Sequence, residues 1–455
     1  MVNIEKRKTN ILVIAFIVTL GSLLFGYNTG VVNGSLVFME RDLVLTAFQK
    51  GLVSSSLTLA AAFGAVFGGS ISDKIGRKKT LRIIAWIFLI GAIGCGISFN
   101  IFILLFFRFL LGLAVGSSSA VIPLYLGEIS SAENRGKMVG LNQVMIVGGQ
   151  LLAFLFNAIL GNIFINNDSI WKVMMGVAAI PAIFMIIGMA KAFESPKWLA
   201  KNGQLSQGIE IIKSIYNTEE SEKEITELRS IKEDHQQENT KQVKKEAIPS
   251  WALKILILGC TLGVIQQFAG INAIMYYGTE ILNQYGFSEK ASLIFNVLNG
   301  VMSVLASLVG MAIVDKLGRK KLEITGLFIC ALALVSVSFF SKVLTGGSAP
   351  YLIMILIFVY IFAFQGAIGP VTWILISEIF PAKYRGSFSG IAVFVLWIAN
   401  FLVGLFFPVL VEVIGINMTF YGFAFCAVLG IFIVQIFIPE TKGKTLEEIE
   451  LHFKK

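Results

Sequence analysis

Long apolar stretches alternate with short polar connections along almost the whole chain. A helix needs about 20 apolar residues to cross a lipid bilayer, and on this criterion the pattern predicts twelve membrane-spanning helices. Six of them precede a polar stretch at residues 196–248 and six follow it. The predicted spans are residues 11–36, 49–72, 80–99, 101–125, 138–161, 170–192, 252–283, 289–314, 322–342, 350–377, 386–412 and 419–438.

The seventh predicted span carries more polar side chains than a lipid-facing helix tolerates. It contains Gln266, Gln267, Asn272 and Tyr276, and the spacing of the last three places them near one helical face. An amide that faces lipid leaves polar groups unpaired, at a cost of several kcal/mol. Facing a hydrated cavity, the same amides offer donors and acceptors to a polyhydroxylated ligand. The alternative is that they only join helices to one another.

Lysine and arginine are concentrated in one set of loops, which predicts a cytoplasmic location for those loops and for both termini. The basic loops contain residues 6–8, 74–82, 135–137, 316–321 and 383–385, whereas the opposite loops hold only Arg41, Lys50, Lys172, Lys290 and Lys342.

The polar stretch between the sixth and seventh spans predicts several short cytoplasmic helices, because it joins an amphipathic segment to charged helix-forming sequence. We expect an N-terminal six-helix bundle at residues 1–195, a cytoplasmic helical linker at 196–248, a C-terminal six-helix bundle at 249–440 and a cytoplasmic tail at 441–455.

The chain repeats internally. Residues 73–79, DKIGRKK, recur as DKLGRKK at 315–321, each after the second span of its half. Glu128 followed by Arg135 recurs as Glu378 followed by Arg385, each after the fourth span. The repeat predicts an all-α membrane protein of two parallel six-helix bundles, with a substrate site near the bilayer midplane between them.

The repeated charges are candidates for a cytoplasmic gate. An exposed ion pair contributes about 0–1 kcal/mol, a size suited to a reversible latch. The alternative, that the bases only set the topology, does not account for the matched acids, because acids contribute little to topology. The predicted gate residues are Asp73, Arg77, Glu128, Arg135, Asp315, Arg319, Glu378 and Arg385.

Composition excludes several classes of protein. Hydrophobic residues make up 56% of the chain and charged residues 14%, well below the share of about 25% in soluble proteins. The net charge of +9 comes from bases spread over short loops, which argues against a nucleic-acid partner. The four cysteines lie in apolar segments and the two histidines in polar ones, so we expect no metal site and no cofactor.

Further motifs accompany the repeated DKxGRKK sequence. They are Arg108; Pro123, Tyr125 and Glu128; residues 194–199, ESPKWL; Gln266, Gln267 and Asn272; Gly369, Pro370 and Trp373; and residues 439–443, PETKG. The DKxGRKK repeat resembles the loop signature of the major facilitator superfamily. With the other motifs, the chain resembles the sugar porters of that superfamily over residues 11 to 448, and within them bacterial carriers of myo-inositol and hexoses.

The resemblance implies a set of substrate-binding residues contributed by both halves. Amides bind hydroxyl groups, and an indole supplies an apolar platform for the C–H faces of a sugar and one N–H donor. The positions that match the family's binding residues are Gln143, Gln150, Gln266, Gln267, Asn272, Trp373, Trp397 and Asn400.

The sequence departs from the family at the positions that bear on proton coupling. Proton-coupled members carry an Asp in the first span, where this chain has Asn28, and some carry a Glu where it has Ala178. A symporter needs a group that titrates within the membrane, and an amide does not titrate. We expect Arg108, the one charge deep in the N-terminal half, to meet Asn28, backbone carbonyls or water. Facilitated diffusion is therefore favoured over proton symport. Proton symport is the alternative, and in that case protons are transported together with the sugar or polyol.

The sequence predicts a monomeric, multi-pass cell-membrane transporter of a hexose, a pentose or myo-inositol. A non-transporting sensor on the same fold is disfavoured by the short tail, and a drug exporter by the amides of the expected cavity. A membrane enzyme is disfavoured because the sequence contains no nucleophile–base pair, metal set or phosphate loop.

Overall fold

The computed structural model describes residues 5–131, 134–216, 218–240, 248–344, 348–381, 383–444 and 446–454. Every element in these residues is a helix. Twelve segments of the described chain are long and apolar enough to cross a membrane, and they match the twelve predicted spans in order.

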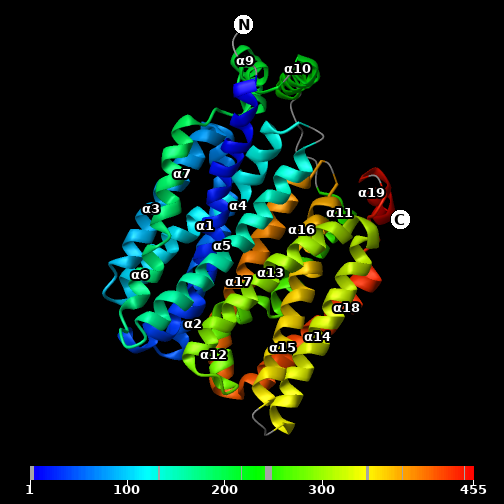
Figure 1. Cartoon of the computed structure of the whole chain (residues 1–455). Helices are drawn as coiled ribbons and strands as arrows, with labels where there is room; N and C mark the ends of the chain where they lie inside the picture. Colours follow the sequence, from blue (N-terminus) through cyan, green and yellow to red (C-terminus); the bar gives the residue numbers. More distant parts are fainter. Residues whose placement is uncertain are drawn as a thin grey trace.

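The first six spans form one half of the molecule (Figure 1). The sixth span consists of two short helices that meet at Val177 and Ala178, ahead of Pro181. The helices are α1 (Glu5–Leu43), α2 (Ala47–Ile75), α3 (Arg77–Gly96), α4 (Ile101–Ile129), α5 (Arg135–Ile163), α6 (Ile170–Gly176) and α7 (Ala179–Lys191).

The last six spans form the other half, in which two spans are broken. The seventh span consists of α11 (Ser250–Phe268) and α12 (Ile271–Gln284). The tenth span consists of α15 (Ala349–Ala363), the π-helical segment η1 (Phe364–Ile368) and α16 (Gly369–Glu378). The other four spans are single helices: α13 (Glu289–Leu317), α14 (Arg319–Val343), α17 (Arg385–Ile414) and α18 (Ile416–Phe437).

The break in the seventh span follows from one glycine. Gly270 has φ of +96°, in the left-handed region that an L side chain rarely adopts. Its N–H bonds the carbonyl of Gln267, so α11 ends at Phe268 and α12 starts in a new direction at Ile271. In the tenth span, the π-helical turn η1 and Pro370 separate α15 from α16.

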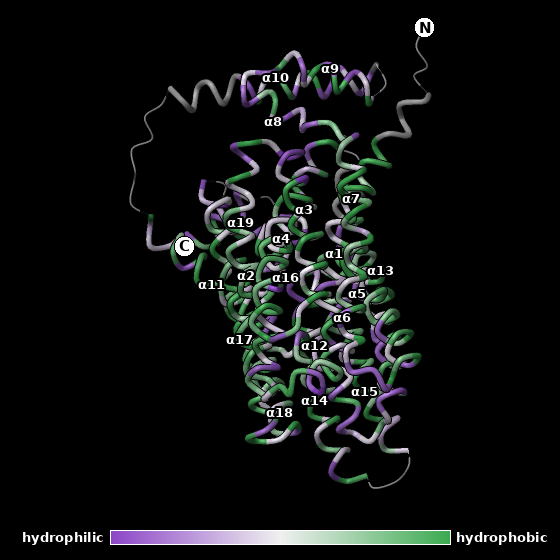
Figure 2. Tube along the Cα trace, turned by 90° about the vertical axis from the view of Figure 1, so that its left-hand side faces the viewer, coloured by the Kyte–Doolittle hydropathy of each residue, from purple (hydrophilic) through white to green (hydrophobic). Residues whose placement is uncertain are grey.

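Three helices lie across one end of the bundle, which we call the linker end (Figure 2). Two are short, α8 (Pro196–Lys201) and α9 (Leu205–Ile215), and the third, α10 (Thr218–Thr240), has 23 residues and is longer than the short helices predicted. They bury a small cluster of their own, Ala200, Ile212 and Leu228, and the Tyr216 hydroxyl donates to the Ile129 carbonyl at 2.7 Å. The last helix, α19 (Leu446–Lys454), packs beside the start of α11, with Lys454 Nζ 4.8 Å from the Trp251 ring centre. The opposite end of the bundle is called the far end.

Hydrophobic residues predominate along the spans (Figure 2), and many of their large apolar side chains are exposed on the outside of the bundle. Phe102 on α4 is 79% exposed and Ile436 on α18 is 68% exposed. Large apolar side chains exposed along the length of many helices are typical of a surface that faces lipid.

Candidate functional site

A cavity of about 120 Å³ lies between the two halves, at the level of the break in the seventh span. The eight predicted binding residues all line it: Gln143, Gln150, Gln266, Gln267, Asn272, Trp373, Trp397 and Asn400. Helix α5 supplies the first two of these residues, and the C-terminal half supplies the other six. The structure therefore brings the predicted set together, while its role in binding stays a prediction.

The amides of the seventh span form a chain of hydrogen bonds. Asn272 Nδ2 donates to Gln267 Oε1 at 2.5 Å, Gln267 Nε2 donates to Gln266 Oε1 at 3.1 Å, and Gln266 Nε2 donates to the Gly369 carbonyl at 3.2 Å. The turn at Gly270 lets Asn272 face back toward Gln267. The amide network therefore connects the break in the seventh span, at Gly270, to the break in the tenth span, where α16 begins at Gly369.

Two polar atoms in the cavity wall are buried and have no protein partner among the described residues: Gln150 Oε1 and Trp397 Nε1. Buried polar atoms are rarely left unpaired in native proteins, so each such atom points to a ligand or water. One is an acceptor and the other is a donor. A hydroxylated ligand can satisfy both kinds of group.

Aromatic rings form the rest of the wall. Trp373 on α16 is 39% exposed and presents its ring, whereas Trp397 on α17 is 3% exposed. The Phe25 ring lies 5.6 Å from that of Trp397, and the Tyr276 hydroxyl donates to Asn400 Oδ1 at 3.1 Å. The predicted binding set omitted Phe25, whose apolar type gave no signal, and Tyr276, whose position in the polar stretch did.

The two residues of the predicted coupling position, Asn28 and Arg108, do not line this cavity. Asn28 Nδ2 donates to the Leu24 carbonyl at 2.8 Å on its own helix. Arg108 is 1% exposed, and its guanidinium contacts the Ser54 carbonyl at 3.3 Å and Met175 Sδ at 4.0 Å. Of the expected partners, a backbone carbonyl is the one observed. No carboxylate lies within 4 Å of Arg108 among the described residues.

The predicted gate residues pair within each half. Arg77 holds Glu128 through two bonds of 2.9 Å and Asp73 through one of 2.8 Å. Arg319 pairs with Asp315 at 2.9 Å and with Glu378 at 3.3 Å. These pairs fasten each half internally, and none of them joins the two halves.

The two remaining predicted gate residues, Arg135 and Arg385, are the first residues of α5 and α17. Arg385 donates to the Phe380 carbonyl at 3.2 and 3.3 Å. The side chain of Arg135 lies outside the described residues. A latch between the halves that uses either residue stays a prediction.

A third acid belongs to each repeated cluster and was missed as a site residue. Glu194 accepts from the N–H groups of Arg77 at 2.8 Å and Lys78 at 3.0 Å, at the start of α3. Glu440 accepts from the N–H of Arg319 at 2.8 Å, at the start of α14. Each acid follows the last span of its half, so an extended search for the repeat would have found the pair.

The environment of Glu440 favours its charged form. Burial alone would raise the pKa of this carboxyl, but the backbone N–H groups of Lys442, Arg319, Lys321 and Thr441 lower it below its usual value. A carboxylate at a helix N-terminus also interacts favourably with the helix dipole.

The two halves are closed together at the far end. Asn33 on α1 donates to the Met275 carbonyl at 2.8 Å and accepts from the Thr279 hydroxyl at 2.8 Å, both on α12. A Cβ at Gly51 on α2 would lie 2.1 Å from the Leu405 carbonyl oxygen on α17, so only glycine allows this approach.

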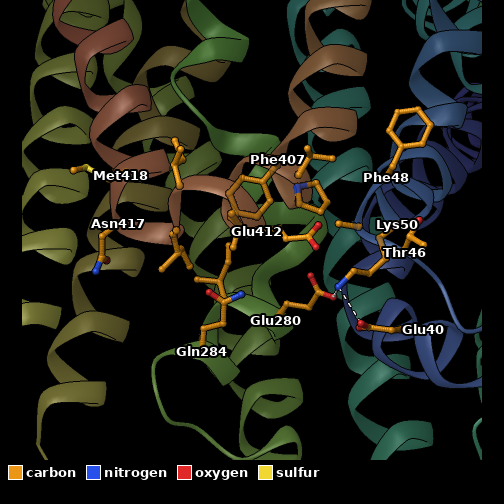
Figure 3. A pocket seen from close by; sticks show the side chains of 18 of the residues that line it. Glu40, Thr46, Phe48, Lys50, Glu280, Gln284, Phe407, Glu412, Asn417 and Met418 are labelled. Carbon is orange, nitrogen blue, oxygen red and sulfur yellow. Dashed lines mark hydrogen bonds and ion pairs between the residues drawn. The ribbon is translucent and has the colours of Figure 1, made fainter.

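Charge pairs between the halves reinforce this closure. They lie at a second cavity, of about 950 Å³, which is at the far end and is separate from the central one (Figure 3). Lys50 on α2 bridges Glu40 of its own half at 3.2 Å and Glu280 of the other half at 3.0 Å. Arg41 reaches across to Glu289 at 3.0 Å. The sequence pattern indicated Arg41 and Lys50 only as bases of the opposite loops, without their acidic partners.

At the linker end the halves are separated by a cavity of about 770 Å³, lined by α2 and α4 on one side and by α16 and α17 on the other. Trp373 lines both this cavity and the central one. The central site is therefore sealed toward the far end and continues toward the linker end.

Twelve spans in two parallel six-helix repeats, with a polar cavity between them that is closed at one end, define a membrane carrier of the major facilitator class. The chain belongs to the sugar transporter family: residues 14–453 match the model described as "Sugar (and other) transporter". This confirms the family predicted from the motifs. The relatives below are transporters and not enzymes.

Relatives with assigned substrates cover almost the whole chain. The major myo-inositol transporter IolT of Bacillus subtilis (strain 168) is 44% identical over 97% of this chain and 94% of its own length. The glucose transporter GlcP of Staphylococcus epidermidis (strain ATCC 12228 / FDA PCI 1200) is 36% identical over 98% of both chains. The D-xylose transporter of Levilactobacillus brevis is 34% identical over 98% of this chain and 96% of its own.

Solved structures of the xylose transporter XylE from E. coli share the fold. Its partially occluded inward-open conformation superposes with a TM-score of 0.83, at 27% identity over 96% of this chain and 100% of that one. The proton:xylose symporter XylE bound to 6-bromo-6-deoxy-D-glucose gives a TM-score of 0.79, at 28% identity over 98% and 99% of the two chains.

Proposed function

We propose that this protein carries a hexose, a pentose or myo-inositol across the cell membrane by alternating access. The observation that carries the proposal is the meeting of eight amide and aromatic residues, from both halves, in one cavity that is sealed at the far end. Rocking of the two halves around such a site exposes it to each side of the membrane in turn.

The chemistry of the cavity wall suits a polyhydroxylated ligand. Each amide presents a donor and an acceptor, as vicinal hydroxyl groups do. Trp373 offers a flat apolar face to the C–H groups of a ring. The functions given for IolT, GlcP and the L. brevis transporter support the same class of substrate.

We propose that the linker end faces the cytoplasm, with both termini on that side, and that the protein acts as a monomer. Support comes from the bases around Lys74, Lys79 and Lys316, which lie at the linker end of α2, α3 and α13. In this orientation the structure is an inward-facing state.

Facilitated diffusion remains the favoured mode if only the family's usual coupling position is considered. Asn28 has no titratable proton, and Arg108 has a backbone carbonyl and a thioether as partners. Proton symport is the alternative, favoured by the likeness to XylE, which is named as a proton:xylose symporter.

Uptake into proteoliposomes tests the proposal. Radiolabelled glucose, fructose, xylose and myo-inositol are offered separately, with and without a proton gradient and a protonophore. We expect saturable uptake of at least one of them, competed by its unlabelled form and lost in Gln267→Ala combined with Asn272→Ala. Uptake that stops at equilibrium indicates facilitated diffusion, and accumulation that a protonophore abolishes indicates symport. Absence of saturable uptake of all four would contradict the proposal.

A further inference from the structure

A carboxyl group is fully buried inside the C-terminal half, one turn into α14. Glu323 is 0% exposed, although it follows a run of basic residues at the linker end. A buried carboxylate is strongly disfavoured unless a cation or several donors compensate its charge. The surroundings of Glu323 therefore decide which form the side chain takes.

Those surroundings supply one donor and no cation. Thr372 Oγ1 on α16 donates to Glu323 Oε1 at 3.0 Å, and Glu323 Oε2 has no partner among the described residues. No lysine or arginine nitrogen lies within 4 Å of this carboxyl in the described part of the chain. Such a site tolerates the neutral acid far better than the carboxylate.

The charged groups on neighbouring elements are engaged elsewhere. On α14, Arg319 pairs with Asp315 of α13 and Glu378 of α16, Lys320 donates to the Gln435 carbonyl of α18, and Lys321 is exposed. The other titratable side chains on α14, α15 and α18 are Lys342, whose Nζ lies 6.0 Å from the Tyr421 ring centre in the last turn of α14; Cys330, whose thiol contacts the Tyr360 carbonyl at 3.7 Å; Tyr360, whose hydroxyl donates to the Ala269 carbonyl; Tyr351; Tyr421; and Cys426.

Arg319 nevertheless has an unused donor. Its Nε is buried without a partner among the described residues, one helical turn before Glu323. Two polar atoms of opposite character, Arg319 Nε and Glu323 Oε2, thus lie unpaired at adjacent turns of one helix. If Glu378 moves away with α16, Arg319 can pair instead with the carboxyl of Glu323, which lies one helical turn further along α14.

Glu323 is linked to the central cavity through α16. This helix is a separate segment, because η1 and Pro370 interrupt the tenth span before it. Thr372, the partner of Glu323, directly precedes Trp373, which lines the cavity. The Glu323–Thr372 bond therefore ties the segment that carries Trp373 to α14.

We propose that Glu323 is a proton-binding positioning residue of the transport cycle: as a neutral acid it holds α16, and with it Trp373, through Thr372. Loss of the proton to water leaves a carboxylate, which accepts a stronger bond from Thr372 than the acid does and is released from it only because the cation of Arg319, one turn away, draws the carboxylate to its free Nε; α16 is then free to move. The proposal deepens the proposed function and rests on it, and it assigns a titratable group to a chain in which Asn28 replaces the family's usual acid.

The first test is sugar counterflow in proteoliposomes at equal pH on both sides, with whichever of the four sugars the wild type carries. Counterflow in the wild type should fall by up to about tenfold per pH unit once Glu323 ionises, the limit for loss of one proton. Glu323→Gln keeps an acceptor for Thr372 and cannot titrate, so it should retain counterflow within about twofold of the low-pH wild type and stay flat with pH.

Two further variants separate positioning from folding. Glu323→Ala removes the acceptor and should lose counterflow at every pH, whereas Thr372→Val should raise KM with less effect on the maximal rate. Glu447→Gln, at an exposed carboxyl on α19, is the control and should keep the wild-type profile. A pH profile in Glu323→Gln equal to that of the wild type, or a wild type without pH dependence, would overturn the proposal.

A second readout needs no substrate and separates this inference from the proposed function. The emission of Trp373, obtained as the difference between the wild type and Trp373→Phe in detergent, should change between low and high pH. The change should be absent in Glu323→Gln. If none of the sugars is carried but this change is seen, the proposed function fails and the link from Glu323 to Trp373 stands. An identical change in Glu323→Gln would reject the link.

Discussion

At the scale of single residues, the amide side chains of the seventh span line the central cavity and hydrogen-bond to one another. Gln267 is the middle member of the amide chain, since it accepts from Asn272 and donates to Gln266. It is 4% exposed, so its hydrogen bonds are shielded from competition by bulk water. A change at this residue therefore affects the orientation of three amides at once.

Gln267→Ala should weaken sugar binding by about 1 kcal/mol or slightly more, which raises KM about five- to tenfold. The physical reason is loss of one amide from the cavity wall and release of its two neighbours. KM for uptake, or the Kd from sugar-induced quenching of tryptophan emission, measures the change. Gln204→Ala, at an exposed glutamine of the linker, is the matched control. Equal KM values for Gln267→Ala and the wild type would remove Gln267 from the binding set.

At the scale of elements, the spans were predictable because hydropathy alone decides whether a helix can lie in lipid. The breaks were not predicted. Hydropathy stays high through Gly270 and through η1, since a break inside protein exposes no backbone to lipid. Gly270 itself was a visible signal, because glycine between two amide-bearing turns is a common point of helix interruption.

The site was predictable where a residue type carries its own chemistry. Gln143, Gln267 and Trp373 are conspicuous in an apolar span. Partners that depend on the packing of the two halves were not predictable: Lys50 was read as a loop base, yet it bridges to Glu280 of the other half. Glu323 was likewise concealed, because its place beside basic residues suggested an exposed helix end.

Glu440 belongs to this scale because it caps α14. Since backbone N–H groups lower its pKa in the folded protein, its charge stabilises the fold above the unfolded value of about 4.3. That contribution is lost as the pH falls through the lower folded value. Glu440→Gln keeps an acceptor oxygen but loses the charge, and should lower Tm by about 1–2 °C at neutral pH.

Thermal unfolding in detergent between neutral pH and about pH 3.5 measures this effect. The difference in Tm between the wild type and Glu440→Gln should be constant down to about pH 5 and shrink below about pH 4. Glu447→Gln serves as the control at an exposed position. A difference that grows as the pH falls would have the wrong sign for a carboxylate held in its charged form.

At the scale of the whole molecule, the two halves hold each other through charges at the far end and are apart at the linker end. The contacts that must break for the site to open toward the far end include those of Asn33, Lys50 and Arg41 with the other half. The motif pairs of Arg77 and Arg319 stay within each half and can persist through the cycle. We therefore predict that the reversible lock in this state is at the end opposite to the repeated motifs.

Lys50→Met should shift the protein toward the state that is open at the far end. Lys50 and Glu280 are each 16% exposed, so loss of their bridge is less screened than at a surface, and a change of about 1 kcal/mol moves the equilibrium about fivefold. Spin labels at Val44→Cys and Val413→Cys, exposed positions at the far end of the two halves, report the change as a longer distance in pulsed dipolar spectroscopy.

Lys342→Met is the matched control for Lys50→Met, since Lys342 lines the same cavity but lies over Tyr421 of its own half. The charge-swapped pair Lys50→Glu with Glu280→Lys should restore the shorter distance in part, because Glu40 then faces a glutamate. Unchanged distances in Lys50→Met would show that backbone contacts such as that of Gly51 close the far end without help from charge.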